Sequence, residues 1–352
     1  MRGGPRCWRA RCFGATRSDI ATLLRLLEPR AGAKVTPGPI GAMLGTVRMT
    51  DSRFHTINDS TGAYALVAPS LGGWLLRYGR DLPGHGLVEA LHYSQEVVDR
   101  YPREMYAGSP MLFPMVSYNH VPGHEHHYVW DGKLWPLPQH GFARRLPWSV
   151  VEQKTNSITM ELRDSEATRA QYPFAFSHRL TYSLADGILN IAQQVENRSS
   201  VPMPFSTGLH PYFSVPFTPR GHRSACFVEI PRASRILMGE HAEGFVSELM
   251  PEQRWSVDRD VSGTLFLGEL ARRELRLVDP ESAIEVVFNF EGSPRHRFAA
   301  IWSKSTTEPF YCLEPWTALP NSCTRTAAAE WILLAPGEVF KAKFWIELRR
   351  LA

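Results

Sequence analysis

The sequence predicts an all-β protein, an antiparallel β-sandwich or barrel. Apolar side chains recur with a period of two over most of the chain after residue 54, prolines and glycines divide that part into short segments, and apolar spacing typical of a helix is rare. The chain has 352 residues and is 43% hydrophobic, which is enough for one large core. A sandwich can hold about 250 residues or more in a single domain.

The clearest strands alternate apolar and polar side chains. Residues 157–164 place Ile158, Met160 and Leu162 on one face, as a half-buried strand requires. Residues 176–197 alternate on both sides of Asp186-Gly187, a pair typical of a two-residue hairpin turn. Residues 284–290 and 342–348 continue the alternation, and one short helix is expected near residues 94–101.

Residues 1–48 differ from the rest of the chain. The first fifty residues contain eight arginines and one lysine against two acidic residues, and only residues 20–27 show helical apolar spacing. We expect an extension outside the fold, either disordered or upstream of a true start near Met43 or Met49. A transit peptide or an arginine-rich arm is the alternative. The sandwich domain is expected to span residues 49–352.

Charge and cysteine usage exclude several classes of protein. Much of the net charge of +4 comes from the first fifty residues, so the remainder is close to neutral, which argues against a nucleic-acid-binding surface. Five cysteines without a C-x-x-C pair predict neither a disulfide framework nor a zinc cage and favour a reducing, cytoplasmic compartment. The sequence has no run of eighteen apolar residues, so no membrane helix is expected.

Four segments interrupt the period of two, and the chemistry is expected there. They are residues 107–114, 138–144, 208–213 and 312–316. A proline follows both His210 and Glu314 and restricts the backbone, so these phrases hold an imidazole and a carboxylate beside aromatic side chains. Such a pair suits acid–base chemistry. Cys312 lies two residues before Glu314 and is expected on the same face of a strand.

Aromatic side chains near these segments are candidates for the flat faces on which sugar C–H bonds pack. The candidates are Trp135, Trp148, Trp316 and Phe213. A place in the hydrophobic core is the alternative for each of them.

Four phrases, in this order, resemble the aldose 1-epimerase family, also called galactose mutarotases. They are Phe-Pro at 113–114, His-Gly-Phe-Ala-Arg at 140–144 followed by Trp148, Gly-x-His-Pro-Tyr-Phe at 208–213, and Glu-Pro-Trp at 314–316. The resemblance covers roughly residues 60–350. It implies a large single-domain antiparallel β-sandwich, the galactose mutarotase-like supersandwich, whose concave face binds a hexose, without a metal or nucleotide cofactor. We expect a monomer or homodimer whose partner is a small-molecule sugar.

The resemblance also implies which residues act. Opening a hexose ring requires a base for the proton of the C1 hydroxyl and an acid for the ring oxygen, and by similarity Glu314 is the base and His210 the acid. Reference pKa values of about 4.3 and about 6.5 predict an ionised carboxylate and an imidazole that can carry a proton. His140 is expected to hydrogen-bond the sugar near its ring oxygen, and Arg144 to hold a substrate hydroxyl or its own loop. Tyr212 and Trp316 are expected to line the sugar site.

Each role has a structural alternative. His210 would then be a core histidine satisfied by the backbone, and Glu314 a paired carboxylate at a strand end. A structural salt bridge is the alternative for Arg144.

The chain departs from the family pattern in two places. The family usually has a sugar-binding arginine after the Phe-Pro phrase, whereas this chain reads Met-Val-Ser-Tyr-Asn-His at 115–120, so Tyr118 or Asn119 is expected to donate hydrogen bonds instead. Neither has the charge or the five donors of a guanidinium, so the substrate preference is expected to differ. Many members also carry an acidic sugar-binding residue upstream of Glu-Pro-Trp, and Asp258 and Asp260 are the candidates here.

The tract Gly-His-Glu-His-His at 123–127 invites a metal-binding interpretation. Its His-x-His spacing resembles the cupin metal motif, but Asp131 stands in place of the expected glutamate and Pro138 in place of a later glycine. A solvated hairpin tip is the better interpretation.

The function predicted from these observations is an aldose 1-epimerase that interconverts the α and β anomers of a hexose. The alternatives are a hexose-6-phosphate 1-epimerase, a sugar-binding protein of the same fold without turnover, and a metal-dependent cupin-like enzyme.

Overall fold

The computed structural model describes residues 51–239, 244–259, 263–323 and 330–351. Residues Ser52–Ala352 form one compact unit. The expectations for residues 1–48 and for Asp260 fall outside the described residues.

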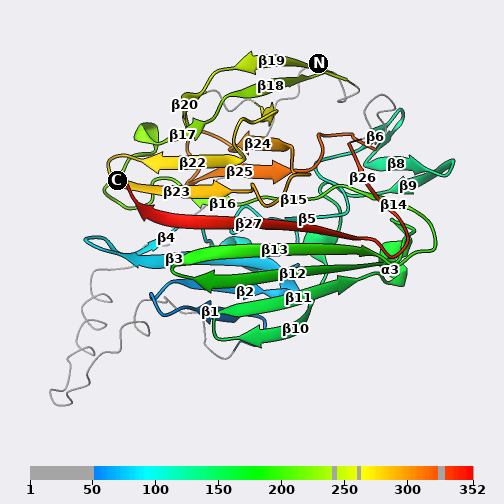
Figure 1. Cartoon of the computed structure of the whole chain (residues 1–352), viewed down its shortest axis with the longest axis horizontal. Coiled ribbons are helices and arrows are strands. Elements are labelled where there is room, and N and C mark those ends of the chain that lie inside the picture. The colour runs from blue at the N-terminus through cyan, green and yellow to red at the C-terminus, as the bar shows by residue number, and fades with distance from the viewer. Residues whose placement is uncertain (1–50, 240–243, 260–262, 324–329, 352) are drawn as a thin grey trace, which may run out of the picture. The chain divides into compact units, whose positions relative to one another are not determined.

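Within the described residues, the larger sheet has nine antiparallel strands (Figure 1). In spatial order they are β10 (Ser149–Lys154), β11 (Ser157–Arg163), β12 (Phe176–Ala185), β13 (Ile188–Asn197), β27 (Val339–Arg350), β23 (Ile284–Asn289), β22 (Glu274–Asp279), β17 (Phe227–Ile230) and β20 (Gln253–Ser256). The long C-terminal strand β27, red in Figure 1, joins the two halves of this sheet because it pairs with both β13 and β23.

The second large sheet has eight strands in the described part of the chain and carries the candidate site. Its order is β19 (Phe245–Met250), β18 (Ala233–Met238), β21 (Leu265–Gly268), β24 (Phe298–Trp302), β25 (Phe310–Trp316), β15 (Gly208–Leu209) and β5 (Met111–Leu112), and β16 (Tyr212–Ser214) also pairs with β25. β25 therefore contacts both β15 and β16 along one edge and β24 along the other.

Smaller elements complete the described structure. The strands are β1 (His55–Asn58), β2 (Tyr64–Ala68), β3 (Trp74–Leu82) and β4 (Gly86–Glu89) in one sheet, and the pairs β14 (Met203–Phe205) with β26 (Ile332–Leu334), β6 (His120–Val121) with β7 (His124–Glu125), and β8 (His127–Trp130) with β9 (Lys133–Pro136). The helical turns are η1 (Pro69–Leu71), α2 (Gln95–Asp99), η2 (Ala143–Arg145), α3 (Glu166–Arg169) and η3 (Arg223–Ala225). None of the helices in the described part of the chain has the length and apolar character needed to cross a membrane.

The predicted all-β fold and its clearest elements are confirmed. Alternation at residues 157–164 corresponds to β11, the hairpin at 176–197 to β12 and β13, and the two later segments to β23 and β27. The short helix is α2, whose N-cap Ser94 accepts a hydrogen bond from the backbone N–H of Val97 at 3.3 Å. The tract at 123–127 lies in the β6–β7 hairpin and the start of β8, and His124, Glu125 and His126 are exposed, as a solvated tip requires.

One hydrophobic core joins the two large sheets. It contains Leu180, Ile191 and Phe288 from the nine-stranded sheet together with Ile301 and Leu313 from the eight-stranded sheet. Because side chains alternate along a strand, the odd-numbered residues of β25 face this core and its even-numbered residues face the other side of the sheet. That other side is where the site lies.

Candidate active site

The register of β25 against β15 and β16 places His210 opposite Glu314. Gly208 pairs with Trp316 and Tyr212 pairs with Cys312. Both pairs belong to the same antiparallel register, so the residue midway between them on one strand faces the residue midway on the other. Pro211 cannot donate a backbone hydrogen bond, and the ladder is interrupted there without losing its register.

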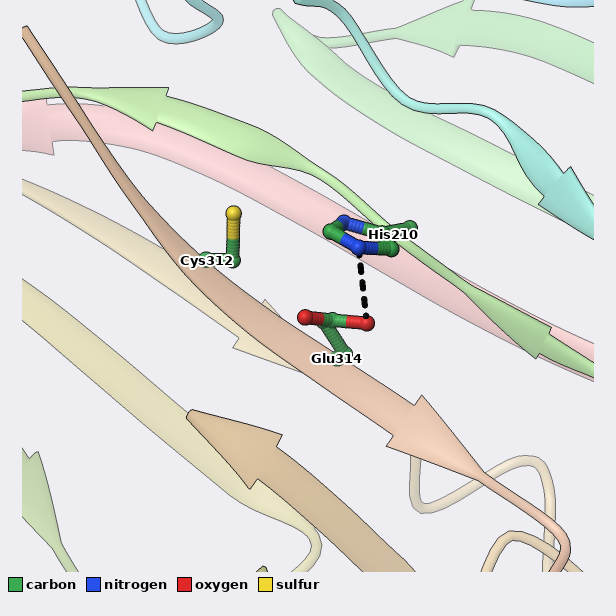
Figure 2. A group of neighbouring side chains, drawn as sticks. All are labelled: His210, Cys312 and Glu314. Atoms are coloured by element: carbon green, nitrogen blue, oxygen red, sulfur yellow. Dashed lines mark ion pairs between the residues drawn. The ribbon is translucent and has the colours of Figure 1, made fainter. Parts of the chain in front are cut away.

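The two predicted catalytic side chains are in contact. His210 Nε2 lies 3.4 Å from Glu314 Oε2, and Figure 2 shows the imidazole pointing from its strand toward the carboxyl group on β25. Only 6% of His210 and 2% of Glu314 is exposed. The Tyr212 ring stacks on the imidazole with centroids 4.6 Å apart, and its hydroxyl oxygen lies 3.4 Å from His210 Nε2. The imidazole is therefore held on its face by Tyr212 and at its edge by Glu314.

Burial changes the ionisation of this pair. It lowers the pKa of His210 to about 3, with a further lowering from the positive charge of Arg144. Burial raises the pKa of Glu314 well above its usual value, opposed in part by Trp316 and Arg144. Both shifts favour the uncharged forms, in which the pair holds one proton and has no net charge. The expected ionised carboxylate and protonated imidazole rest on reference pKa values for groups in water, and burial shifts both pKa values against that charge state.

His140 belongs to the same site, and its tautomer follows from its backbone contacts. Its Nδ1 accepts a hydrogen bond from the backbone N–H of Ser117 at 3.0 Å. Burial lowers the pKa of His140 well below its usual value, so the ring is neutral and its single proton is on Nε2. The ring lies edge-on to His210, with centroids 5.4 Å apart. His140 can therefore donate one hydrogen bond from Nε2.

The loop after His140 is bound to the Phe-Pro phrase. The backbone N–H groups of Phe142 and Ala143 both donate to the carbonyl oxygen of Phe113, each at 3.1 Å. Gly141 has a φ of +68°, and a Cβ there would lie 2.2 Å from the same carbonyl oxygen. Only glycine fits this position. Two phrases of the family pattern are thus parts of one structural unit.

Arg144 lies on η2 and is 91% buried, with 9% of the residue exposed. Its Nη2 donates to the carbonyl oxygen of Gln139 at 3.2 Å, and its Nε has no hydrogen-bond partner among the described residues. Burial lowers its pKa to about 10, so the guanidinium remains charged at neutral pH. The described residues show no ion pair for Arg144, in contrast to the structural salt bridge considered as its alternative.

These side chains line a cavity of about 440 Å³, a size typical of small-molecule sites. The cavity brings together seven of the residues selected from the sequence, which are Tyr118, His140, Arg144, His210, Tyr212, Glu314 and Trp316. His210 and Glu314 thus meet in one wall of a space that can hold a pyranose.

Three other residues selected from the sequence are not among the described residues that line this cavity. Asn119 is buried and lines a neighbouring cavity of about 280 Å³, which shares Tyr118 and Gln139 with the larger one. Asp258 follows β20 and does not line the larger cavity; its Oδ1 lies 3.2 Å from Nε of Arg223. Asp260 is outside the described residues.

The flat faces of the cavity come from Tyr106, Tyr212, Trp302, Trp316 and Phe266. Among the four aromatic candidates, only Trp316 lines it. Trp135, Trp148 and Phe213 belong to the core cluster or pack against it.

The sequence pattern did not predict Tyr106 or Trp302 as site residues. Trp302 pairs with Cys312 across β24 and β25, and only this strand pairing, which the sequence pattern does not reveal, places it beside His210. Tyr106 directly precedes the irregular segment at 107–114, which was the available clue.

The chain belongs to the aldose 1-epimerase family, whose family model matches residues 56–347. This match spans the whole of the site described above. The resemblance noted from the four phrases is confirmed.

Individual relatives are distant. The chain is 27% identical over 200 residues to chromosomal LacX of Lactococcus lactis subsp. lactis, covering 53% of this chain and 65% of LacX, so it spans slightly less than two thirds of that relative. It is 31% identical over 83 residues to a putative glucose-6-phosphate 1-epimerase of Salmonella typhimurium, covering 22% of this chain and 26% of that protein. A galactose mutarotase-like protein from Clostridium acetobutylicum has a TM-score of 0.72 at 19% identity, covering 83% of this chain and 94% of that one, which shows a shared fold.

Proposed function

We propose that this protein is an aldose 1-epimerase that interconverts the α and β anomers of a free hexose. The observation that carries the proposal is the 3.4 Å contact between His210 Nε2 and Glu314 Oε2 in the wall of the 440 Å³ cavity. Membership of the family supports the reaction class. That the substrate is a free hexose is likewise proposed.

The reaction needs one proton removed and one delivered. A base takes the proton of the C1 hydroxyl, the C1–O5 bond breaks to leave an aldehyde at C1, and an acid protonates O5. Rotation about C1–C2 and closure of the ring by the reverse transfers give the other anomer. The proposal keeps Glu314 as the base and His210 as the acid for ring opening.

The single proton of the pair makes this exchange possible. Moving it from Glu314 to His210 across their 3.4 Å contact gives the carboxylate and imidazolium that the assignment requires. The opposite order, with neutral His210 as base and protonated Glu314 as acid, uses the same two groups and the same proton. Loss of either side chain therefore stops both orders.

His140 is proposed to stabilise the open form of the sugar, and Arg144 to bind a sugar hydroxyl. The Nε2–H of neutral His140 can donate to an oxygen that becomes more negative when the ring opens. Arg144 offers a buried positive charge whose Nε has no partner among the described residues. Tyr212, Trp302 and Trp316 offer flat surfaces for the C–H faces of a pyranose.

A hexose 6-phosphate is the second candidate substrate. Three arginines line the cavity, Arg103, Arg144 and Arg145, against two glutamates, Glu104 and Glu314. Even with both glutamates ionised, these side chains give the lining a net positive charge. A phosphate group would be attracted to it. A sugar-binding protein without turnover is the remaining alternative within the same fold.

The experiment is to measure anomer exchange by NMR for glucose, galactose and their 6-phosphates, with and without the protein. Faster exchange of a free hexose supports the proposal, whereas acceleration of the phosphorylated sugars alone supports the second candidate. Binding of a hexose in calorimetry without any acceleration supports the third. Neither binding nor acceleration with all four sugars contradicts all three.

A cytoplasmic location and a monomeric or homodimeric state complete the proposal. The odd number of cysteines without a C-x-x-C pair supports the location. Size-exclusion chromatography with light scattering measures the oligomeric state.

A further inference from the structure

Cys312 lies next to the acid–base pair but has no part in the chemistry proposed above. It is two residues before Glu314 on β25, so both side chains emerge on the same face of the strand (Figure 2). It is fully buried and does not line the cavity. Each of the three residues His210, Cys312 and Glu314 offers one possible ligand atom, and these three atoms lie within 4.8 Å of one another. Imidazole, thiol and carboxyl groups are the ligands that zinc takes in proteins.

We propose that His210, Cys312 and Glu314 form a binding site for a soft divalent cation of the Zn²⁺ class, and that the bound cation inhibits the enzyme. Ligand atoms at about 2.0–2.3 Å from a tetrahedral zinc ion lie about 3.3–3.6 Å from one another. The contact between His210 Nε2 and Glu314 Oε2, at 3.4 Å, already matches one edge of such a tetrahedron. A separation of up to 4.8 Å requires only about 1 Å of side-chain adjustment.

The charge of the three groups also suits a divalent cation. A thiolate and a carboxylate together carry two negative charges, so a Zn²⁺ complex of this site is neutral, and a neutral complex is far less costly to bury than a charged one. Three protein ligands leave the fourth position for water or a sugar oxygen from the cavity, which His210 and Glu314 line. The thiol selects against Mg²⁺ and Ca²⁺, which prefer oxygen ligands.

Two features make this an inhibitory site of moderate affinity. A zinc-bound histidine usually donates its second ring N–H to a partner, whereas His210 Nδ1 is buried without a partner among the described residues. Arg144, which lines the same cavity, repels a cation. Occupancy is therefore set by the metal concentration, and a bound ion takes the lone pairs that the acid–base pair needs for proton transfer.

The direct test is a Co²⁺ titration of the full chain. Cys7 and Cys12 are replaced by alanine in every variant, because their thiols are outside the described residues. We expect tetrahedral Co²⁺ absorption with a near-ultraviolet thiolate-to-cobalt charge-transfer band. Cys312→Ser should abolish this band, and Cys226→Ala, which removes a buried thiol elsewhere, should keep it. The exposed histidines His124 and His126 and the partly buried His127 carry no thiolate and cannot produce the band.

Glu314→Gln gives a second variant that keeps the thiol. It should retain the band but bind Co²⁺ about tenfold or more weakly, since one anionic ligand is lost. An absent band at saturating Co²⁺, a band that persists in Cys312→Ser, or unchanged affinity in Glu314→Gln would each overturn the site.

Inhibition rests on the proposed function and is measured separately. Zn²⁺ should inhibit anomer exchange, a chelator should restore it, and Cys312→Ala should need about tenfold or more Zn²⁺ for the same inhibition. Equal inhibition of wild type and Cys312→Ala would contradict the inhibitory role. If the protein has no epimerase activity, the cobalt spectrum still decides the site, so the two proposals can fail independently.

Discussion

Gly208 on β15 lies directly opposite Trp316 on β25, and a Cβ on Gly208 would lie 2.5 Å from Cδ1 of the indole. It would also lie 2.8 Å from the carbonyl oxygen of Pro315. The glycine of the Gly-x-His phrase thus provides the space in which the tryptophan of the Glu-Pro-Trp phrase rests against the cavity. The Gly-x-His and Glu-Pro-Trp segments therefore pack against each other in the wall of the cavity.

Gly208→Ala should therefore destabilise the protein by about 1–3 kcal/mol, the cost of forcing atoms into a packed region. It should also slow anomer exchange by displacing Trp316. Urea unfolding measures the first effect and NMR exchange the second. Gly263→Ala is the control, because an added Cβ there meets no atom of the described residues within 4 Å. Equal stability of the two variants would show that the close approach does not matter.

Activity should not fall as the pH drops from about 7 to about 5. An ordinary histidine titrates near 6.5, but burial lowers the pKa of His210 to about 3, so a second proton enters the pair only at much lower pH. The alkaline limit is the loss of the single shared proton, and it lies above the usual glutamate range because the pKa of Glu314 is raised. The pH dependence of kcat/KM provides the measurement. A decrease centred near pH 6.5 would contradict the burial argument.

Arg144→Met should raise KM by about tenfold or more with little change in kcat, since a hydrogen bond to a charged group contributes about 1.5–3 kcal/mol. Arg144→Lys should recover part of the loss, because lysine keeps the charge but not the planar fork. Steady-state kinetics with the sugar that proves active decides the point. A fall in kcat at unchanged KM would instead place Arg144 in the proton-transfer step.

His296 should make stability depend on pH. It is fully buried against Phe340 and Phe344, and both ring nitrogens lack a hydrogen-bond partner among the described residues. Burial lowers its folded-state pKa to about 3, whereas the unfolded value is 6.5. The unfolded chain thus binds more protons below pH 6.5, and stability falls as pH drops from 6.5 toward 3, by about 1.4 kcal/mol per pH unit for this residue.

The folded-state pKa values of His140, His178 and His210 are also lowered and act in the same direction, whereas Glu314, whose pKa is raised, acts in the opposite direction above pH 4.5. His296→Phe removes one contribution and should reduce the slope of unfolding free energy against pH by about one proton. Urea unfolding at several pH values between about 5 and 7.5 measures the slope. An unchanged slope would mean that His296 is protonated in the folded state.

Much of the fold could be predicted because period-two alternation is a local property of the sequence. The hairpin at 176–197 and strand β11 follow from side chains that alternate between core and solvent. The alternation also predicted that Cys312 and Glu314 share a face. It carries no information about which strands pair, so the contact of Trp302 with the site was not predictable from β24 alone.

The sequence predicted which residues form the site but not their ionisation, and the reason is physical. Residue types and motif order selected His210, Glu314, His140 and Arg144, all of which line the cavity. Their ionisation depends on burial, which results from packing by segments distant in sequence, so reference pKa values do not describe the buried pair. Asp258 looked like a sugar ligand by position, but its carboxylate lies against Arg223.

The most direct test of the central claim is anomer exchange measured by NMR for the wild type, His210→Asn and Glu314→Gln, with Asp258→Asn as the control outside the cavity. Each of the first two substitutions should lower the catalysed rate by about 10²-fold or more, the loss expected when a positioned acid or base is removed. Asp258→Asn should keep the wild-type rate. Wild-type exchange rates in both His210→Asn and Glu314→Gln would show that these two side chains are not the acid and base of the reaction.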